Sequence, residues 1–218
     1  MCAVTRLPDH PLAAVVERDF VAAWWLLAEV IDAERHDRDG VRWYHTGLAE
    51  KYLNPVLVTH LADDQADTVI DEHLARLGER GAPFVWWAMP SASPRDLGDR
   101  LRERGLVADD SWPGMAVAVD RLADPPPVDG LEILRVRTDH DLDRHTGVFA
   151  PILSPSPAFT ETLVTASRRI GFEEDAPEVH FLGVLDGEPV ATASLVTAGG
   201  AAGIYNVTTV EAARGRGI

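Results

Sequence analysis

Apolar residues in the first half of the chain recur at two spacings, and each spacing predicts one kind of element. Five of them stand three or four residues apart and mark one face of a helix over 16–31: Val16, Phe20, Trp24, Leu27 and Ile31. A second helix is expected over 62–81, with acidic residues in its first turn, and a third follows Ser93-Pro94. Short β-branched and aromatic runs predict strands at 41–47, 55–61, 83–89, 105–109 and 114–120.

Two further helices are expected in the second half. The first follows a strand over 131–138, and Thr138 or Asp139 could cap it by accepting from a free N–H of its first turn. The second covers 158–172. The segment 149–159, which joins these helices, contains three prolines and is predicted to be a loop.

A β meander follows these helices. Two β runs within 179–196 meet at Asp186-Gly187, and both of these residues tolerate the positive φ of a two-residue hairpin turn. A glycine-containing turn then leads to a third strand over 204–210. Alternation along this strand predicts two faces: Asn206, Thr208 and Val210 on one, and Tyr205, Val207 and Thr209 on the other.

A proline-rich segment separates two halves of different composition. All six tryptophans lie before Pro113, while 124–130 holds three consecutive prolines and ends in Asp-Gly. We predict a smaller α/β lobe over 1–123, a linker over 124–130 and a second domain over 131–218. The expected fold class is α/β with α+β layers, in which a mixed, largely antiparallel sheet is flanked by helices.

Charge and apolar content limit the partners of this chain. It has 218 residues, of which 46% are hydrophobic, and its net charge is -15. Because this charge repels nucleic acid and anionic membranes, neither is expected as a partner, and an anionic ligand needs a local positive site. No apolar run reaches the ~18 residues of a membrane span. The only cysteine is Cys2, which argues against disulfide scaffolds and cysteine-based zinc sites. A cytoplasmic protein is therefore expected.

The last predicted strand runs directly into the sequence Arg-Gly-Arg-Gly-Ile at 214–218. Two glycines around an arginine allow the backbone to curl with its N–H groups inward, which forms a cradle for an anion. Taken alone, such a short motif is also typical of an ordinary turn. The chain has no P-loop motif, and the hairpin connections argue against a dinucleotide-binding βαβ unit.

The order of strand, two helices, Asp-Gly hairpin, strand and glycine-rich loop in 131–218 resembles the GNAT superfamily of acyl-CoA-dependent N-acetyltransferases. The pyrophosphate loop of this family reads (Arg/Gln)-x-x-Gly-x-(Gly/Ala), and 214–218 matches its first five positions. The first half resembles the degenerate front lobe of two-domain members at 53–61, 81–106 and 113–120. The resemblance implies that the C-terminal part of the fold lies beyond Ile218.

The resemblance also implies a reaction and a cosubstrate. The family transfers an acetyl group from acetyl-CoA to a primary amine, here that of a small molecule or a peptide, and it needs no metal. Main-chain groups of the last strand, at Val207, Thr208 and Thr209, would bind the pantetheine arm and support the oxyanion. The pyrophosphate would lie on the loop residues Arg214, Gly215, Arg216, Gly217 and Ile218.

The residues that transfer protons are not identified by this resemblance. Asn206 could orient an amine or a water, but an amide cannot act as a general base. The segment 149–159 is expected to border the acceptor. Glu211 stands where the family often has proline, and its carboxylate would repel a phosphate unless it faces solvent. The aspartates and histidines of 139–145 favour an acidic helix start over a metal site.

Two functions stay open at this point. The chain is either an N-acetyltransferase or a catalytically inactive CoA-binding or interaction protein that retains the fold. Its last strand would also present an unpaired edge, and such an edge can pair with a second copy. A homodimer is therefore a further expected assembly.

Overall fold

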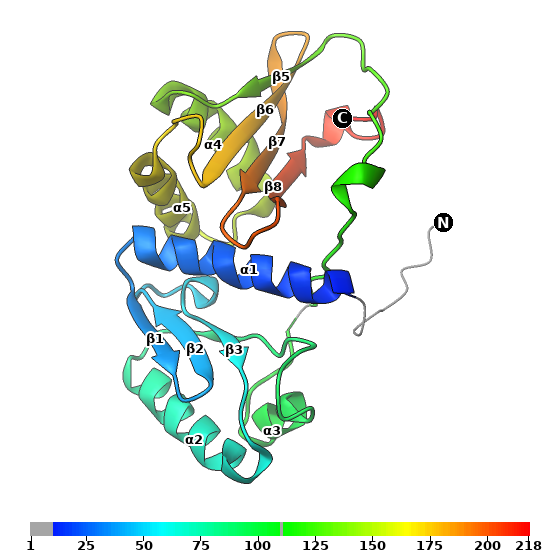
Figure 1. Cartoon of the computed structure of the whole chain (residues 1–218). Coiled ribbons are helices and arrows are strands. Elements are labelled where there is room, and N and C mark those ends of the chain that lie inside the picture. The colour runs from blue at the N-terminus through cyan, green and yellow to red at the C-terminus, as the bar shows by residue number, and fades with distance from the viewer. Residues whose placement is uncertain (1–10, 110) are drawn as a thin grey trace. The chain divides into compact units, whose positions relative to one another are not determined.

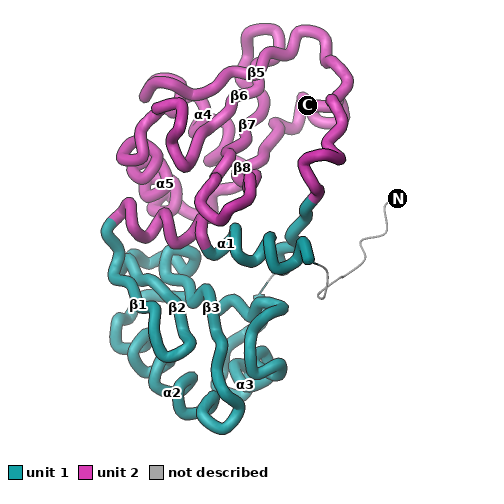
Figure 2. Tube along the Cα trace, in the orientation of Figure 1, with its two compact units in different colours: residues 1–21, 32–116 teal, residues 22–31, 117–218 magenta. Residues whose placement is uncertain are grey.

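Helix α1 (Pro11–Val30) carries the first apolar stripe, as the spacing of its apolar residues predicts. The computed structural model describes residues 11–109 and 111–218, and these form five α-helices and two four-stranded sheets (Figure 1). The chain divides into two compact units: one holds the residues up to Val21 and 32–116, the other 22–31 and 117–218 (Figure 2). The predicted fold class is confirmed. Among the described helices, none is long and apolar enough to cross a membrane.

The first unit is built on a mixed sheet in the order β1-β2-β3-β4. β1 (Glu34–Arg38) and β2 (Val41–His45) form a hairpin, and β3 (Pro55–Thr59) pairs antiparallel with β2. β4 (Val85–Trp86) pairs parallel with β3 and is shorter than the run of apolar residues predicts. β1 was not predicted, because its sequence is polar throughout and only His36 is buried. It is an edge strand, and an edge strand needs few apolar residues.

Two helices complete the core of the first unit. α2 (Asp63–Glu79) lies against the sheet, and α3 (Leu97–Glu103) adds two leucines to the same cluster. Burial of each large apolar side chain contributes about 1.5–3 kcal/mol to folding. The cluster contains Val41, Trp43, Val56, Ala66, Ile70, Leu77, Trp86, Leu97 and Leu101.

The strands predicted over 105–109 and 114–120 are not formed, so this part of the prediction is wrong. Between Glu103 and Leu131 the described residues form no strand, and their one short helical element is a 3-10 turn at Val119–Arg121. Val107 and Met115 are both 91% exposed, so their side chains contribute no packing energy. An apolar run becomes a strand only where a neighbouring strand supplies hydrogen bonds and a packing surface. Among the described residues, no strand supplies either to Val107 or Met115.

The second unit contains an antiparallel sheet in the order β5-β6-β7-β8. Its strands are β5 (Leu131–Arg135), β6 (Glu178–Leu185), β7 (Glu188–Val196) and β8 (Gly203–Thr209). The predicted hairpin turn between β6 and β7 is confirmed, because Asp186 and Gly187 have φ of 52° and 91°. Helix α4 (Asp139–Leu153) packs on β6, β7 and β8, and Thr138 caps it as expected.

The proline-rich segment 149–159 is mostly helical, which corrects the prediction of a loop. α4 continues through Pro151 to Leu153, and α5 (Pro157–Ile170) begins only four residues later. Pro151 lies in the last turn of α4, where it removes the N–H that would bond the carbonyl of Gly147, and the helix ends two residues later. Pro157 occupies the first turn of α5, where its missing N–H removes no helical hydrogen bond. The connecting loop is therefore reduced to residues 154–156.

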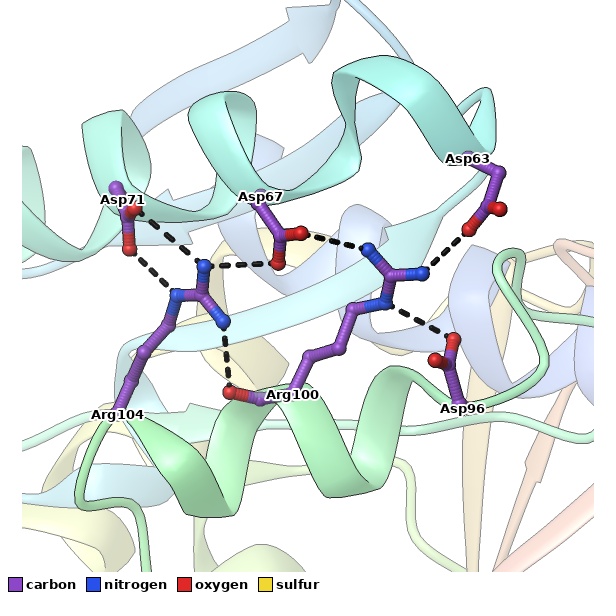
Figure 3. A network of polar contacts seen from close by, with 6 residues as sticks. All are labelled: Asp63, Asp67, Asp71, Asp96, Arg100 and Arg104. Carbon is purple, nitrogen blue, oxygen red and sulfur yellow. Dashed lines mark hydrogen bonds and ion pairs between the residues drawn. The ribbon is translucent and has the colours of Figure 1, made fainter.

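A network of arginines and aspartates joins α2 to the α3 region in the first unit (Figure 3). Arg100 contacts Asp67 at 2.9 Å and Asp96 at 3.0 Å, and it also binds Asp63. Arg104 contacts Asp67 at 2.8 Å and also pairs with Asp71. The three α2 aspartates are four residues apart, so they form one row on the helix that faces both guanidinium groups.

We predict that Arg100→Ala lowers the thermal midpoint of unfolding more than Arg102→Ala does. Both arginines are on α3, but Arg102 is 57% exposed and its one ion pair among the described residues is with Asp99, whereas Arg100 joins three aspartates. The decrease in the thermal midpoint caused by Arg100→Ala should be larger at low salt than in 1 M salt, because salt screens ion pairs. Calorimetry of both variants at two salt concentrations measures this. Equal decreases in the midpoint for the two variants would contradict a stabilising role of the ion pairs of Arg100.

Candidate functional site

The last strand of the meander contains a β-bulge. Thr192 of β7 is opposite Thr208 of β8, whereas Ser194, two residues further along β7, is opposite Tyr205. One residue of β7 therefore faces two residues of β8, Asn206 and Val207. Asn206 has φ of 52°, a left-handed conformation that asparagine tolerates better than most residues. The bulge interrupts the backbone ladder at this point.

The bulge overturns the simple alternation predicted for this strand. Thr208 and Tyr205 lie opposite two β7 residues that share one buried face, so they point to the same side of the sheet. The prediction placed them on opposite faces. The extra residue changes the parity of the strand, which puts Thr208 in the interior and leaves Val207 60% exposed.

Buried hydroxyl groups hold the bulge from β7. The Thr192 hydroxyl donates to the backbone carbonyl of Asn206 at 2.8 Å. Since its single proton is used there, Thr192 accepts from the Thr208 hydroxyl, which lies 2.6 Å away. The side-chain amide of Asn206 donates to the Ser194 hydroxyl at 3.2 Å. The Thr192 hydroxyl thus gives one backbone carbonyl of the bulge a partner, and two side-chain hydrogen bonds fix the residues around it.

The same chain of hydrogen bonds continues through a buried histidine into α5. Ser194 Oγ lies 2.8 Å from Nδ1 of His180, and Nε2 of His180 lies 3.0 Å from Ser167 Oγ. Ser167 donates its own proton to the carbonyl of Leu163 at 2.9 Å, so it accepts from Nε2–H of His180. Ser194 therefore donates to Nδ1. Each hydroxyl and the imidazole in this series of hydrogen bonds then donates to one acceptor. The series requires that His180 is neutral.

The pKa shifts of the buried histidines agree with a neutral His180. Burial, followed by the neighbouring His145, lowers the pKa of His180 to about 3. Burial also lowers the pKa of His145 to about 4, and the two rings are 5.0 Å apart. Glu178 lies 4.0 Å from His180, and burial raises its pKa to about 7. Near neutral pH both imidazoles are uncharged, as their burial requires.

The glycine-rich loop follows β8 after a short 3-10 turn at Glu211–Ala213. Arg214 donates from Nε to the carbonyl of Thr209 at 3.0 Å, so the loop is fastened to the end of the strand. Gly215 and Gly217 have φ of 73° and 85°, conformations that glycine adopts without strain. Ile218 packs on the apolar cluster around Leu185 and Val190, while Glu211 is exposed. Val207 and most of the loop residues at 214–218 are therefore at the surface, whereas the side chain of Thr208, which lies between them in the sequence, is buried.

The aspartates and histidines of 139–145 are not brought together. Asp139 and Asp143 contact Arg168 at 2.8 and 3.0 Å, and Asp141 accepts from the capping Thr138. His145 lies apart from them in the interior. Among the described residues, no group of three or more metal-binding side chains is present.

Sequence reasoning missed the buried polar chain, although one signal of it was available. β7 is buried at every second residue, and two of these inward positions are Thr192 and Ser194 rather than apolar residues. Polar residues on the buried face of a strand need partners. This pattern could have indicated an irregular neighbouring strand.

Comparisons with known proteins agree with this architecture. No family model and no curated protein matches the sequence. Among solved structures, the chain is similar to a GCN5-related N-acetyltransferase from Kribbella flavida, with a TM-score of 0.65 and 16% identity over 92% of this chain and 75% of that chain. It is also similar to a functionally unknown conserved protein from Staphylococcus epidermidis ATCC 12228, with a TM-score of 0.55 and 11% identity over 86% and 76%. The fold is therefore that of the GCN5-related N-acetyltransferases.

We predict that Ser194→Ala lowers the free energy of unfolding by about 1–3 kcal/mol, because both Asn206 and His180 lose a buried partner. The exposed Ser91 provides a matched control, and Ser91→Ala should change the stability by less than about 0.5 kcal/mol. Urea denaturation of both variants measures the difference. If Ser194→Ala costs no more than the control, the proposed chain of hydrogen bonds is wrong.

Proposed function

We propose that this protein is an N-acetyltransferase that transfers an acetyl group from acetyl-CoA to a primary amine of a small molecule or peptide. The observation that carries this proposal is the bulge at Asn206 and Val207, placed directly before the Arg-Gly-Arg-Gly loop. In a GNAT-type fold, the bulge and the loop together support the binding of acyl-CoA.

The backbone of β8 suits an extended pantetheine arm. Within the described residues β8 pairs with β7 alone, so the backbone groups on its other side face away from the sheet. The arm can bind there as an additional strand would, at Val207, Thr208 and Thr209. An N–H at the bulge can donate to the thioester oxygen as negative charge develops on it. Because the buried hydroxyls fix the bulge, little reorganisation is needed.

The loop suits the pyrophosphate of the cosubstrate. Gly215 and Gly217 curl the backbone on either side of Arg216, and Arg214 is already held at the end of β8. Backbone N–H groups and guanidinium groups are both good partners for phosphate oxygens. The exposed side chain of Glu211 can keep its charge in solvent. This local positive segment offsets the net charge of -15 at the place where an anion must bind.

The net negative charge also favours a cationic acceptor. A protonated amine is attracted over a long range, whereas an anionic acceptor is repelled. We propose that the short loop at 154–156 and the adjoining end of α4, where Ile152 and Leu153 are 39% and 47% exposed, border this acceptor. His180 is unsuited to act as the general base, because both of its ring nitrogens are occupied by serine hydroxyls.

The turnover of acetyl-CoA tests the proposed function. We expect free CoA thiol to be released in the presence of a primary amine from a panel of small amines and peptides, at a rate above hydrolysis. Binding of acetyl-CoA without release on any amine would favour the inactive CoA-binding alternative. If acetyl-CoA neither binds nor raises the thermal midpoint, both functions are contradicted.

Gly215→Ala tests the loop separately from the chemistry. Gly200, in the turn before β8, is a matched control, because Gly200 and Gly215 have φ of 75° and 73° and neither has a neighbour within 4 Å of an added Cβ. Each substitution to alanine should cost about 1 kcal/mol of stability because of the positive φ. Only Gly215→Ala should weaken acetyl-CoA binding, by roughly tenfold, which is the loss of about one charge-assisted hydrogen bond. Titration calorimetry that shows equal affinities for the two variants would contradict the loop assignment.

A further inference from the structure

A pocket of about 370 Å³ lies in the first unit, and residues of the edge strand β1 and of the C-terminal end of α2 line it. Four arginines line it, two from β1, one from α2 and one directly after α2, together with the carboxylates of Glu34 and Asp39. His36 and Trp43 form the rest of its wall. In a chain with a net charge of -15, this is a local excess of positive charge.

We propose that this pocket binds a phosphate group, either as free phosphate or as the phosphomonoester of a small molecule. The proposal is independent of acetyl transfer, since the pocket belongs to the unit that does not contain β8 and the glycine-rich loop. Guanidinium groups match the geometry and charge of phosphate oxygens better than any other side chain.

One arginine has a structural part in this pocket. Arg80 donates from Nε to Glu34 at 3.0 Å and makes a second contact to the same carboxylate. Its Nη1 donates to the carbonyl of Arg76 at 2.6 Å, and its guanidinium lies 4.9 Å from the ring centre of Trp43. Arg80 is thus fixed on three sides and forms a rigid wall. Its charge is largely neutralised by Glu34.

Two other arginines supply the charge that a ligand would meet. Arg38 and Arg76 are exposed, and neither side chain makes an ion pair or hydrogen bond within 11–109 and 111–218. They approach the pocket from different elements, β1 and α2. Arginines without partners repel each other across such a pocket, and a doubly charged anion between them removes that repulsion.

One ring nitrogen of the histidine in the wall has no hydrogen bond among the described residues, while the ring interacts with the backbone of Arg38. His36 is only 4% exposed, and its Nε2 has no hydrogen bond in the described structure. Its ring stacks on Trp43, with ring centres 5.1 Å apart and planes 3° apart. Burial, followed by the charges of Arg76 and Arg38, lowers its pKa. The imidazole therefore lies in the positive field of Arg76 and Arg38, and a bound anion would reduce that field.

Titration calorimetry with inorganic phosphate and with phenyl phosphate, at fixed ionic strength and pH 7, tests the proposal. We expect saturable binding to the wild-type protein and at least a tenfold weaker affinity for Arg76→Gln and Arg38→Gln. Arg102→Gln is the control, because it removes one exposed positive charge of the same unit at a distance from the pocket. Tighter binding of phenyl phosphate identifies a phosphomonoester as the ligand, and equal binding identifies free phosphate.

Two outcomes would overturn the proposal. The first is the absence of saturable binding of either probe to the wild-type protein. The second is an equal loss of affinity in Arg102→Gln, since the effect would then come from net charge and not from a site. NMR provides an independent measurement: phosphate should shift the imidazole signals of His36 and leave those of His180, which belongs to the other unit, unchanged. Shifts at His180 without shifts at His36 would also contradict the site.

Discussion

The hydrogen bonds from Thr192 and Ser194 to Asn206 are the interaction on which the candidate site depends. A bulge leaves backbone groups without ladder partners, and a left-handed residue costs free energy. In this chain the Thr192 hydroxyl binds the freed carbonyl, and Ser194 holds the side-chain amide. These hydrogen bonds fix the bulge at the place where Val207 is exposed to solvent.

Neutrality is the condition that makes this buried polar chain stable. A charged imidazole in the interior would cost several kcal/mol unless a counter-ion were present. His180 avoids that cost, because it donates to Ser167 and accepts from Ser194 without carrying charge. A fully satisfied network rigidifies its surroundings, whereas a single missing partner leaves an unsatisfied group in a region of low dielectric constant. The second unit thus couples the conformation of β8 to residues on β6, β7 and α5.

The charged residues of this acidic chain are not evenly distributed. In the first unit the row of aspartates on α2 is matched by Arg100 and Arg104, so much of its charge acts locally between two helices (Figure 3). Two other places hold arginines outside this network: Arg214 and Arg216 in the loop at 214–218, and Arg38 and Arg76 at the pocket between β1 and α2. Local excesses of this kind allow an acidic protein to select anions at defined positions while its general field repels them.

The sequence by itself determined the helices, the Asp-Gly hairpin and the glycine-rich loop, because apolar spacing, capping residues and positive-φ residues act over a few positions. It also indicated the fold class. Only the tertiary structure decided that β1 forms at a sheet edge, that 105–109 and 114–120 form no strands, and that Pro151 lies within α4. Only the tertiary structure placed Tyr205 and Thr208 on one face and joined Asn206 to His180. These outcomes depend on which residues of distant segments meet, and pairing partners far apart in the chain are not encoded in the spacing of any one segment.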